Sequence, residues 1–101
     1  MMDRKAIDDA IKTIAYHYGV KAQSMQTCEE CAELIVAVSK AVRSPSSANI
    51  KNLAEEIADV QIMCSQMMWI YDISLVEVGD IIERKLQRQL ERIREASHEH
   101  A

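Results

Sequence analysis

The segment SPSSAN, residues 44 to 49, separates two long stretches in which apolar residues recur with helical spacing. Pro45 has no amide hydrogen to donate, and its ring clashes with the preceding turn, so an arriving helix ends here. The serines favour caps and turns because they compete for backbone hydrogen bonds. We therefore predict a helical hairpin, with one helix from about Lys21 to Arg43 and the next from near Ala48–Asn49 to about Tyr71.

Two further helices are predicted on either side of this hairpin. The first begins at Asp3 as N-cap and ends at Tyr18, because Gly19 follows it. The last begins at SLVE, where Ser74 and Glu77 form a capping box, and continues through Ile93 before a polar tail that we expect to fray. No segment alternates apolar and polar residues with period two. The sequence therefore predicts an all-α, four-helix fold in a single domain over residues 1–101.

Composition narrows the class of protein. The net charge of −4 argues against binding to nucleic acid or to an anionic membrane surface. No apolar stretch reaches the roughly 18 residues needed to cross a bilayer. The N-terminal segment is charged where a signal peptide would be apolar, and the odd number of three cysteines argues against a disulfide framework. We therefore expect a cytoplasmic protein.

The hairpin helices carry more apolar surface than one partner can cover. Their expected main stripes comprise Cys28, Cys31, Ile35, Val38 and Val42 on the first, and Leu53, Ile57, Val60, Cys64, Met67, Met68 and Tyr71 on the second. Val36 and Ala37 lie off the first stripe, and Ile62 and Trp69 lie off the second. A second apolar face usually means a second partner. We therefore expect a homodimer or homotetramer of packed hairpins.

Two acidic clusters stand in these apolar helices, EECAEL at residues 29–34 and EEIADV at residues 55–60. Both follow the same order: acid, acid, any residue, alanine, acid, aliphatic. A single Glu-x-x-Glu on a helix is most often an ordinary solvated surface. Two matching clusters, each embedded among aliphatic residues, favour metal binding instead.

The spacing within each cluster places its acids together. Glu30 and Glu33 are three residues apart and share one face of their helix, and Glu56 and Asp59 do the same on the next helix. In an antiparallel hairpin both pairs can come level. Four converging carboxylates repel one another and raise one another's pKa, unless a hard cation such as Mg²⁺ or Mn²⁺ lies between them.

The succession EECAE and EEIAD resembles the EExxE…ExxD signature of the MazG-like, all-α nucleoside triphosphate pyrophosphohydrolases, over nearly the whole chain. The resemblance implies a helical bundle assembled as dimers or tetramers. It also implies Mg²⁺-dependent cleavage of a (d)NTP between the α and β phosphates, giving a monophosphate and pyrophosphate. Carried over residue by residue, the implied metal ligands are Glu30, Glu33, Glu56 and Asp59. Glu29 would orient the attacking water, and Glu55 has no role in the family's motif.

The last predicted helix is basic. Any one of its basic residues could equally well be an ordinary solvated side chain with local ion pairs as a phosphate contact. The resemblance implies a lysine and a nearby arginine that contact phosphate on this helix, and Lys85 matches the lysine. Gln89 stands where the arginine is usual, so Arg88 or Arg92 would have to replace it.

Weaker expectations concern the base and the cysteines. His17 and Trp69 could stack on a nucleobase, and Gln23 could hydrogen-bond its edge, although simple packing is the commoner role of such rings. Cys28 and Cys31 form a CxxC inside a helix, where we expect structural rather than redox roles.

Other interpretations share these residues. Phosphoribosyl-ATP pyrophosphohydrolases and dimeric dUTPase-like proteins belong to the same superfamily and would differ in the base pocket. From another class, a non-catalytic helical adaptor would carry the acids as surface decoration. A ferritin-like di-iron centre is excluded, because it needs Glu-x-x-His on two helices and the chain has one, Glu95 to His98.

Overall fold

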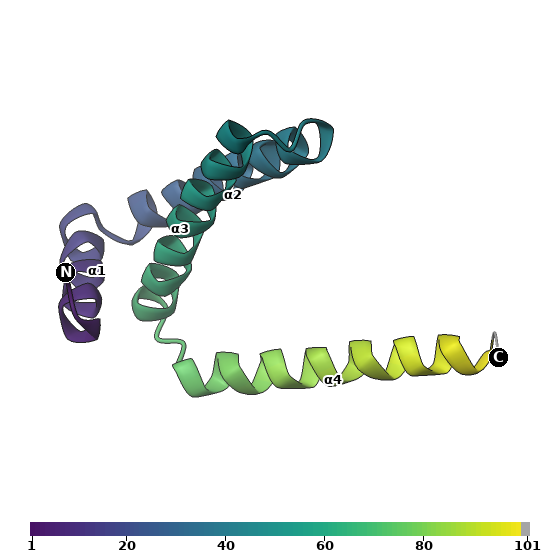
Figure 1. The fold of residues 1–101 in the computed structure, drawn as a ribbon. Coiled ribbons are helices and arrows are strands. Elements are labelled where there is room, and N and C mark those ends of the chain that lie inside the picture. The colour runs from purple at the N-terminus through teal and green to yellow at the C-terminus, as the bar shows by residue number, and fades with distance from the viewer. Residues whose placement is uncertain (100–101) are drawn as a thin grey trace.

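The computed structural model describes residues 1–99, and this part of the chain folds into helices joined by short turns (Figure 1). The helices are α1 (Arg4–Tyr18), α2 (Val20–Arg43), α3 (Ser47–Ile70) and α4 (Leu75–Glu99). The all-α prediction is confirmed, and most helix ends agree within one residue. The exception is α4, which remains helical to Glu99 and so includes the first part of the tail SHEHA, residues 97–101, that we expected to fray. Residues 100 and 101 of this tail lie outside the described part of the chain.

Side-chain caps fix where the helices begin. Asp3, Ser46 and Ser74 each accept a hydrogen bond from the backbone amide three residues on, over 2.8, 3.2 and 3.0 Å respectively. Each bond satisfies an amide that has no partner within its own helix. The caps at Asp3 and Ser74 were expected from the sequence, and both are confirmed.

Gly19 joins α1 to α2 without an intervening loop. Its backbone has φ +91° and ψ 168°, a region that is essentially restricted to glycine. The amide of Gly19 still bonds to the carbonyl of Ala15, and α2 begins at the next residue. This single residue therefore turns the chain so that α1 can pack against both α2 and α3.

Helices α2 and α3 form the predicted antiparallel hairpin, and their contact is the main packing surface (Figure 1). The less exposed residues alternate at spacings of four and three, as in a coiled-coil seam. This seam comprises Gln23, Thr27, Glu30, Leu34, Ala37 and Ala41 on α2, and Asn49, Leu53, Glu56, Val60, Met63, Gln66, Met67 and Ile70 on α3, where Gln66 adjoins Met67 and is 1% exposed. Glu30 and Glu56 therefore occupy positions within the packing surface.

The face that α2 packs differs from the predicted one. Cys28, Ile35, Val38 and Val42 are exposed, whereas Ala37, which we placed on the second face, is only 1% exposed. Small residues allow two helices to approach closely, so the alanine side of α2 packs and the larger aliphatic side chains remain outside. The prediction that Cys28 is a structural core residue is therefore wrong for the single chain.

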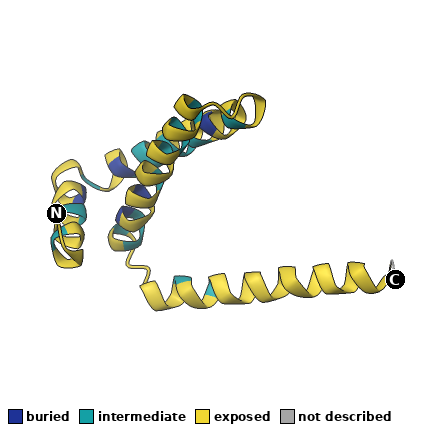
Figure 2. Ribbon diagram, viewed as in Figure 1, coloured by how far each residue is buried: buried dark blue, intermediate teal, exposed yellow. Residues whose placement is uncertain are grey.

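Helix α4 does not complete a bundle within the chain. It leaves the end of α3 through a short turn, projects away from the hairpin and buries none of its residues (Figures 1 and 2). The radius of gyration is 17.5 Å, against about 13 Å for a compact chain of this length. Among residues 1–99, no helix is both long enough and apolar enough to cross a bilayer.

The two glycines provide a matched test of the α1–α2 connection. Gly19→Ala should lower the free energy of unfolding by about 1–3 kcal/mol, because alanine is strained at this backbone conformation. Gly79→Ala, within helical α4 and with open space around its new methyl, should instead increase helix content. Urea unfolding followed by circular dichroism measures both effects. A Gly19→Ala protein as stable as the wild type would contradict this account of the turn.

Candidate metal centre

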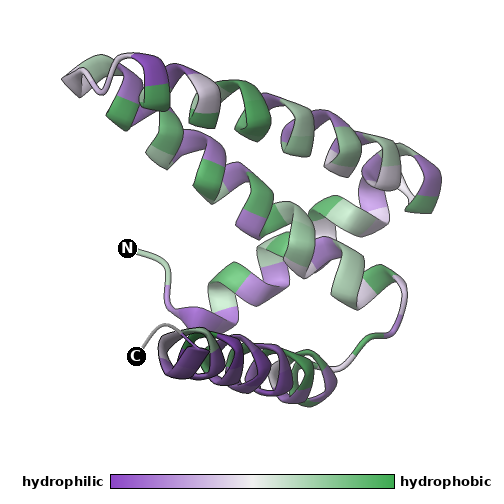
Figure 3. Cartoon of the chain, turned by 90° about the vertical axis from the view of Figure 1, so that its right-hand side faces the viewer, coloured by the Kyte–Doolittle hydropathy of each residue, from purple (hydrophilic) through white to green (hydrophobic). Residues whose placement is uncertain are grey.

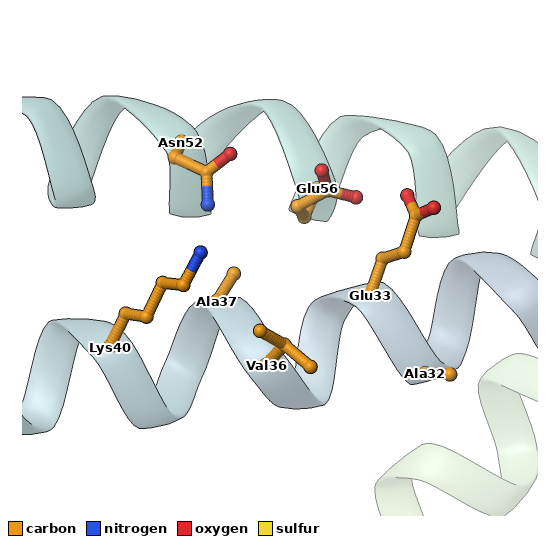
Figure 4. Close-up of a pocket in the computed structure, with 7 residues that line it drawn as sticks. All are labelled: Ala32, Glu33, Val36, Ala37, Lys40, Asn52 and Glu56. Carbon is orange, nitrogen blue, oxygen red and sulfur yellow. The ribbon is translucent and has the colours of Figure 1, made fainter.

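Three carboxylates converge in the hairpin seam. Glu30 and Glu33 come from α2 and Glu56 from α3, and one oxygen of each lies within 4.8 Å of the others. Figure 4 shows Glu33 and Glu56 pointing toward each other across the gap between the helices. We call these three residues the carboxylate cluster. The predicted juxtaposition of the two acidic motifs is therefore present for three of its four acids.

Two oxygens of the carboxylate cluster lack partners. Oε2 of Glu30 and Oε2 of Glu56 are buried and accept no hydrogen bond from the described residues. The other oxygen of Glu30 accepts a bond of 2.8 Å from Nε2 of Gln26, which holds this side chain in place. A buried acceptor without a donor is unfavourable. The arrangement of unpartnered carboxylate oxygens fits the ligand preference of a hard divalent cation such as Mg²⁺ or Mn²⁺.

The electrostatic consequence is seen at Glu56. Its burial in the seam raises the pKa of this carboxyl, and the negative charges of Glu33, Asp59 and Glu30 raise it further. The charged form of Glu56 is thus less favourable in the folded protein than in the unfolded chain. A bound cation would act in the opposite direction by favouring the charged form.

The other acids of the two motifs lie outside the cluster. Asp59 is exposed, and the antiparallel register brings it level with Glu30, near enough for its charge to raise the pKa of Glu56. Glu29 and Glu55 are exposed on their helices. Among these three, Asp59 is therefore the residue placed to add a fourth carboxylate to the cluster.

The residues predicted to contact phosphate stand apart from the cluster in this chain. Lys85, Arg88 and Arg92 are all exposed on α4, which does not pack along the hairpin (Figure 2). In the described chain these three side chains therefore do not lie at the carboxylate cluster.

The residues predicted to bind a base are also separate from the cluster. Gln23 is buried, and its amide donates a hydrogen bond to the amide oxygen of Gln66 across the seam. Trp69 lines a shallow pocket with Lys12, Thr13 and Tyr16, about 20 Å along α3 from Glu56. The exposed ring of His17 packs edge-on against Tyr18, with ring centroids 4.7 Å apart. None of the three lies at the carboxylate cluster.

The structure adds residues to the site that were not singled out from the sequence. A pocket of about 300 Å³ opens between α2 and α3, lined by Ala32, Glu33, Val36, Ala37, Lys40, Asn52 and Glu56 (Figure 4). Lys40 lies seven residues after Glu33, and Asn52 lies four residues before Glu56. These helical spacings, which put each pair on one face, are the pattern that could have identified them.

No protein-family profile, no curated protein sequence and no solved structure matches this chain.

The raised pKa of Glu56 predicts how stability depends on pH without divalent cations. The folded protein binds the proton of the Glu56 carboxyl more tightly than the unfolded chain does. Protonation of Glu56 therefore adds to the free energy of unfolding at acidic pH, and this contribution is lost as pH rises through the raised pKa of Glu56. With chelator present, the melting temperature should fall between mildly acidic and neutral pH, and Glu56→Gln should reduce that fall. Glu55→Gln, an exposed neighbour, is the control. An unchanged pH dependence in Glu56→Gln would contradict the placement of Glu56.

Proposed function

We propose that this protein is a MazG-like, Mg²⁺-dependent nucleoside triphosphate pyrophosphohydrolase that cleaves a (d)NTP between the α and β phosphates. The observation that carries the proposal is the carboxylate cluster, in which two acidic motifs from antiparallel helices present buried, unpartnered oxygens to one another. Like charges held this close are unfavourable by themselves, which is the expected property of a site arranged for cations.

In this proposal Glu30, Glu33 and Glu56 hold Mg²⁺, with Mn²⁺ as a substitute, and Asp59 is the fourth ligand. A divalent cation held by these carboxylates would neutralise phosphate oxygens and would lower the pKa of a bound water. Glu29, which is exposed beside Glu30, orients the water and accepts its proton. Hydrolysis of a phosphoanhydride depends mainly on positioning and charge neutralisation, so no serine or cysteine nucleophile is needed.

We propose in addition that the active form is a homodimer or homotetramer in which helices from a second copy complete the bundle. The support is the apolar surface left open on α4, seen nearly end-on in Figure 3 with its apolar residues along one side. Its exposed apolar residues, between 51% and 73% exposed, are Leu75, Val76, Ile82, Leu86, Leu90 and Ile93. Association would cover this stripe and bring the basic residues of one α4 toward the acids of another copy.

One observation favours a different class of function. The exposed aliphatic faces of α2 and α4 would also suit a helical adaptor that binds another protein, with the acids as surface decoration. The two proposals differ in their response to Mg²⁺. Superfamily members that act on phosphoribosyl-ATP or on dUTP share the acidic motif, and a panel of nucleotide substrates separates them.

The catalytic proposal predicts metal-dependent stability and activity together. Mg²⁺ at about 100 times its dissociation constant should stabilise the folded state by about 2.7 kcal/mol, observed as a rise in melting temperature. Incubation with canonical and modified (d)NTPs should release pyrophosphate. Glu33→Gln and Asp59→Asn should reduce this release by about 100-fold or more with unchanged helix content.

Glu55→Gln is the matched control, because Glu55 is exposed and outside the carboxylate cluster. It should keep nearly full activity and the same response to Mg²⁺. An adaptor would show neither the stabilisation nor the pyrophosphate release.

The assembly proposal is tested by mass in solution. Light scattering should give two or four times the chain mass of 11.5 kDa. Leu86→Glu places a charge in the middle of the α4 stripe and should shift the protein toward the monomer. Gln87→Glu adds the same charge one position away and should leave the assembly intact. A wild-type protein that is monomeric at all concentrations would contradict the proposal.

A further inference from the structure

The pocket between α2 and α3 has two chemically different ends. Glu33 and Glu56 of the carboxylate cluster form one end, and Lys40 and Asn52 form the other (Figure 4). Between them the lining is Val36 and Ala37, and Ala32 lies beyond Glu33 (Figure 4). The volume, about 300 Å³, is at the lower limit of pockets that hold small ligands.

Lys40 does not neutralise the carboxylates with which it shares this pocket. Within residues 1–99, the ion pairs are Arg4 with Asp8 and Lys5 with Asp9, both on α1. The ammonium of Lys40 therefore lies more than 4 Å from either carboxylate. Figure 4 shows it directed across the pocket toward Asn52, where an anion would meet an ammonium and an amide together.

The spacing along the helices indicates the shape of that anion. Lys40 stands two helical turns, about 10 Å, from Glu33, and Asn52 stands one turn, about 6 Å, from Glu56. These separations are along the helix axes, and the long side chain of Lys40 shortens the gap. A chain of phosphates suits a pocket with these two ends, because its metal-bound oxygens could lie at the acidic end while its terminal phosphate reaches Lys40 and Asn52.

We propose that Lys40 and Asn52 form a subsite for the terminal phosphate of a metal-bound nucleoside triphosphate. This inference rests on the proposed function and extends it, since it places the leaving pyrophosphate between the carboxylate cluster and Lys40. Lysine contacts a phosphate as a point charge, and the asparagine amide donates a hydrogen bond to it. The subsite makes the enzyme prefer nucleoside triphosphates, because a nucleoside diphosphate lacks the terminal phosphate that Lys40 binds.

The test measures cation binding and anion binding separately. Mn²⁺ binding is followed by electron paramagnetic resonance without phosphate, and the affinity for inorganic pyrophosphate is then measured by calorimetry with Mg²⁺ present. Lys40→Met should leave Mn²⁺ binding intact and weaken pyrophosphate binding about tenfold or more. Lys40→Arg keeps the charge and should retain most of the affinity. Lys51→Met, an exposed lysine beside Asn52 but outside the pocket, is the control and should bind as the wild type does.

Each outcome decides between the two proposals. If wild-type protein binds Mn²⁺ and hydrolyses triphosphates while Lys40→Met keeps full affinity for pyrophosphate, the subsite is wrong and the proposed function stands. The subsite is equally wrong if Lys40→Met loses Mn²⁺ binding, because Lys40 would then act on the cation site. If wild-type protein neither binds Mn²⁺ nor hydrolyses triphosphates, the proposed function fails and the subsite fails with it.

Discussion

The packing of α2 against α3 places acidic side chains where a helical hairpin would ordinarily bury aliphatic ones. Glu30 and Glu56 both belong to the seam, and each keeps one buried oxygen without a hydrogen-bond donor. The surrounding contacts, centred on residues such as Ala37 and Met63, must hold the helices together against this repulsion. Without a bound cation, the hairpin is therefore less stable than its apolar contacts alone would make it. A cation between the carboxylates would reduce their mutual repulsion. Stability and the proposed activity thus depend on the same few atoms.

A polar pair elsewhere in the seam sets the register on which this depends. Gln23 and Gln66 are both buried and hydrogen-bond to each other near the α1 end of the hairpin. A buried polar pair disfavours other registers, because sliding one helix along the other would leave both amides unpaired. The same register brings Glu33 level with Glu56 and places Lys40 and Asn52 on one pocket. Gln23, considered from sequence as a base contact, has this structural role in the described chain.

The sequence was informative wherever local chemistry decides the outcome. Pro45, the serine and aspartate caps and Gly19 each act within a few residues, so the helices and all their ends except the C-terminal end of α4 were predictable. The convergence of Glu30, Glu33 and Glu56 was predictable as well, because three-residue spacing and an antiparallel turn are enough to bring them together.

The sequence was less informative about packing between helices. From the sequence we expected the face of α2 that carries its larger aliphatic residues to be buried. In the structure the face with Ala37 and Ala41 packs against α3 instead, because small side chains allow the two helices to approach closely. The direction of α4 could not be predicted either, because none of its residues is buried against the rest of the described chain. Lys40 was missed because a lone lysine on a helix ordinarily indicates only solvent exposure, and its partner Asn52 is distant in sequence.

We have proposed that the carboxylate cluster holds divalent cations between α2 and α3. Crystals grown with Mn²⁺ test it most directly, because anomalous scattering locates this ion independently of the protein atoms. We expect an anomalous peak for a Mn²⁺ ion that is coordinated by oxygens of Glu30, Glu33 and Glu56. A structure with Mn²⁺ in the crystal, but with these three side chains turned apart into solvent and no peak between them, would contradict it.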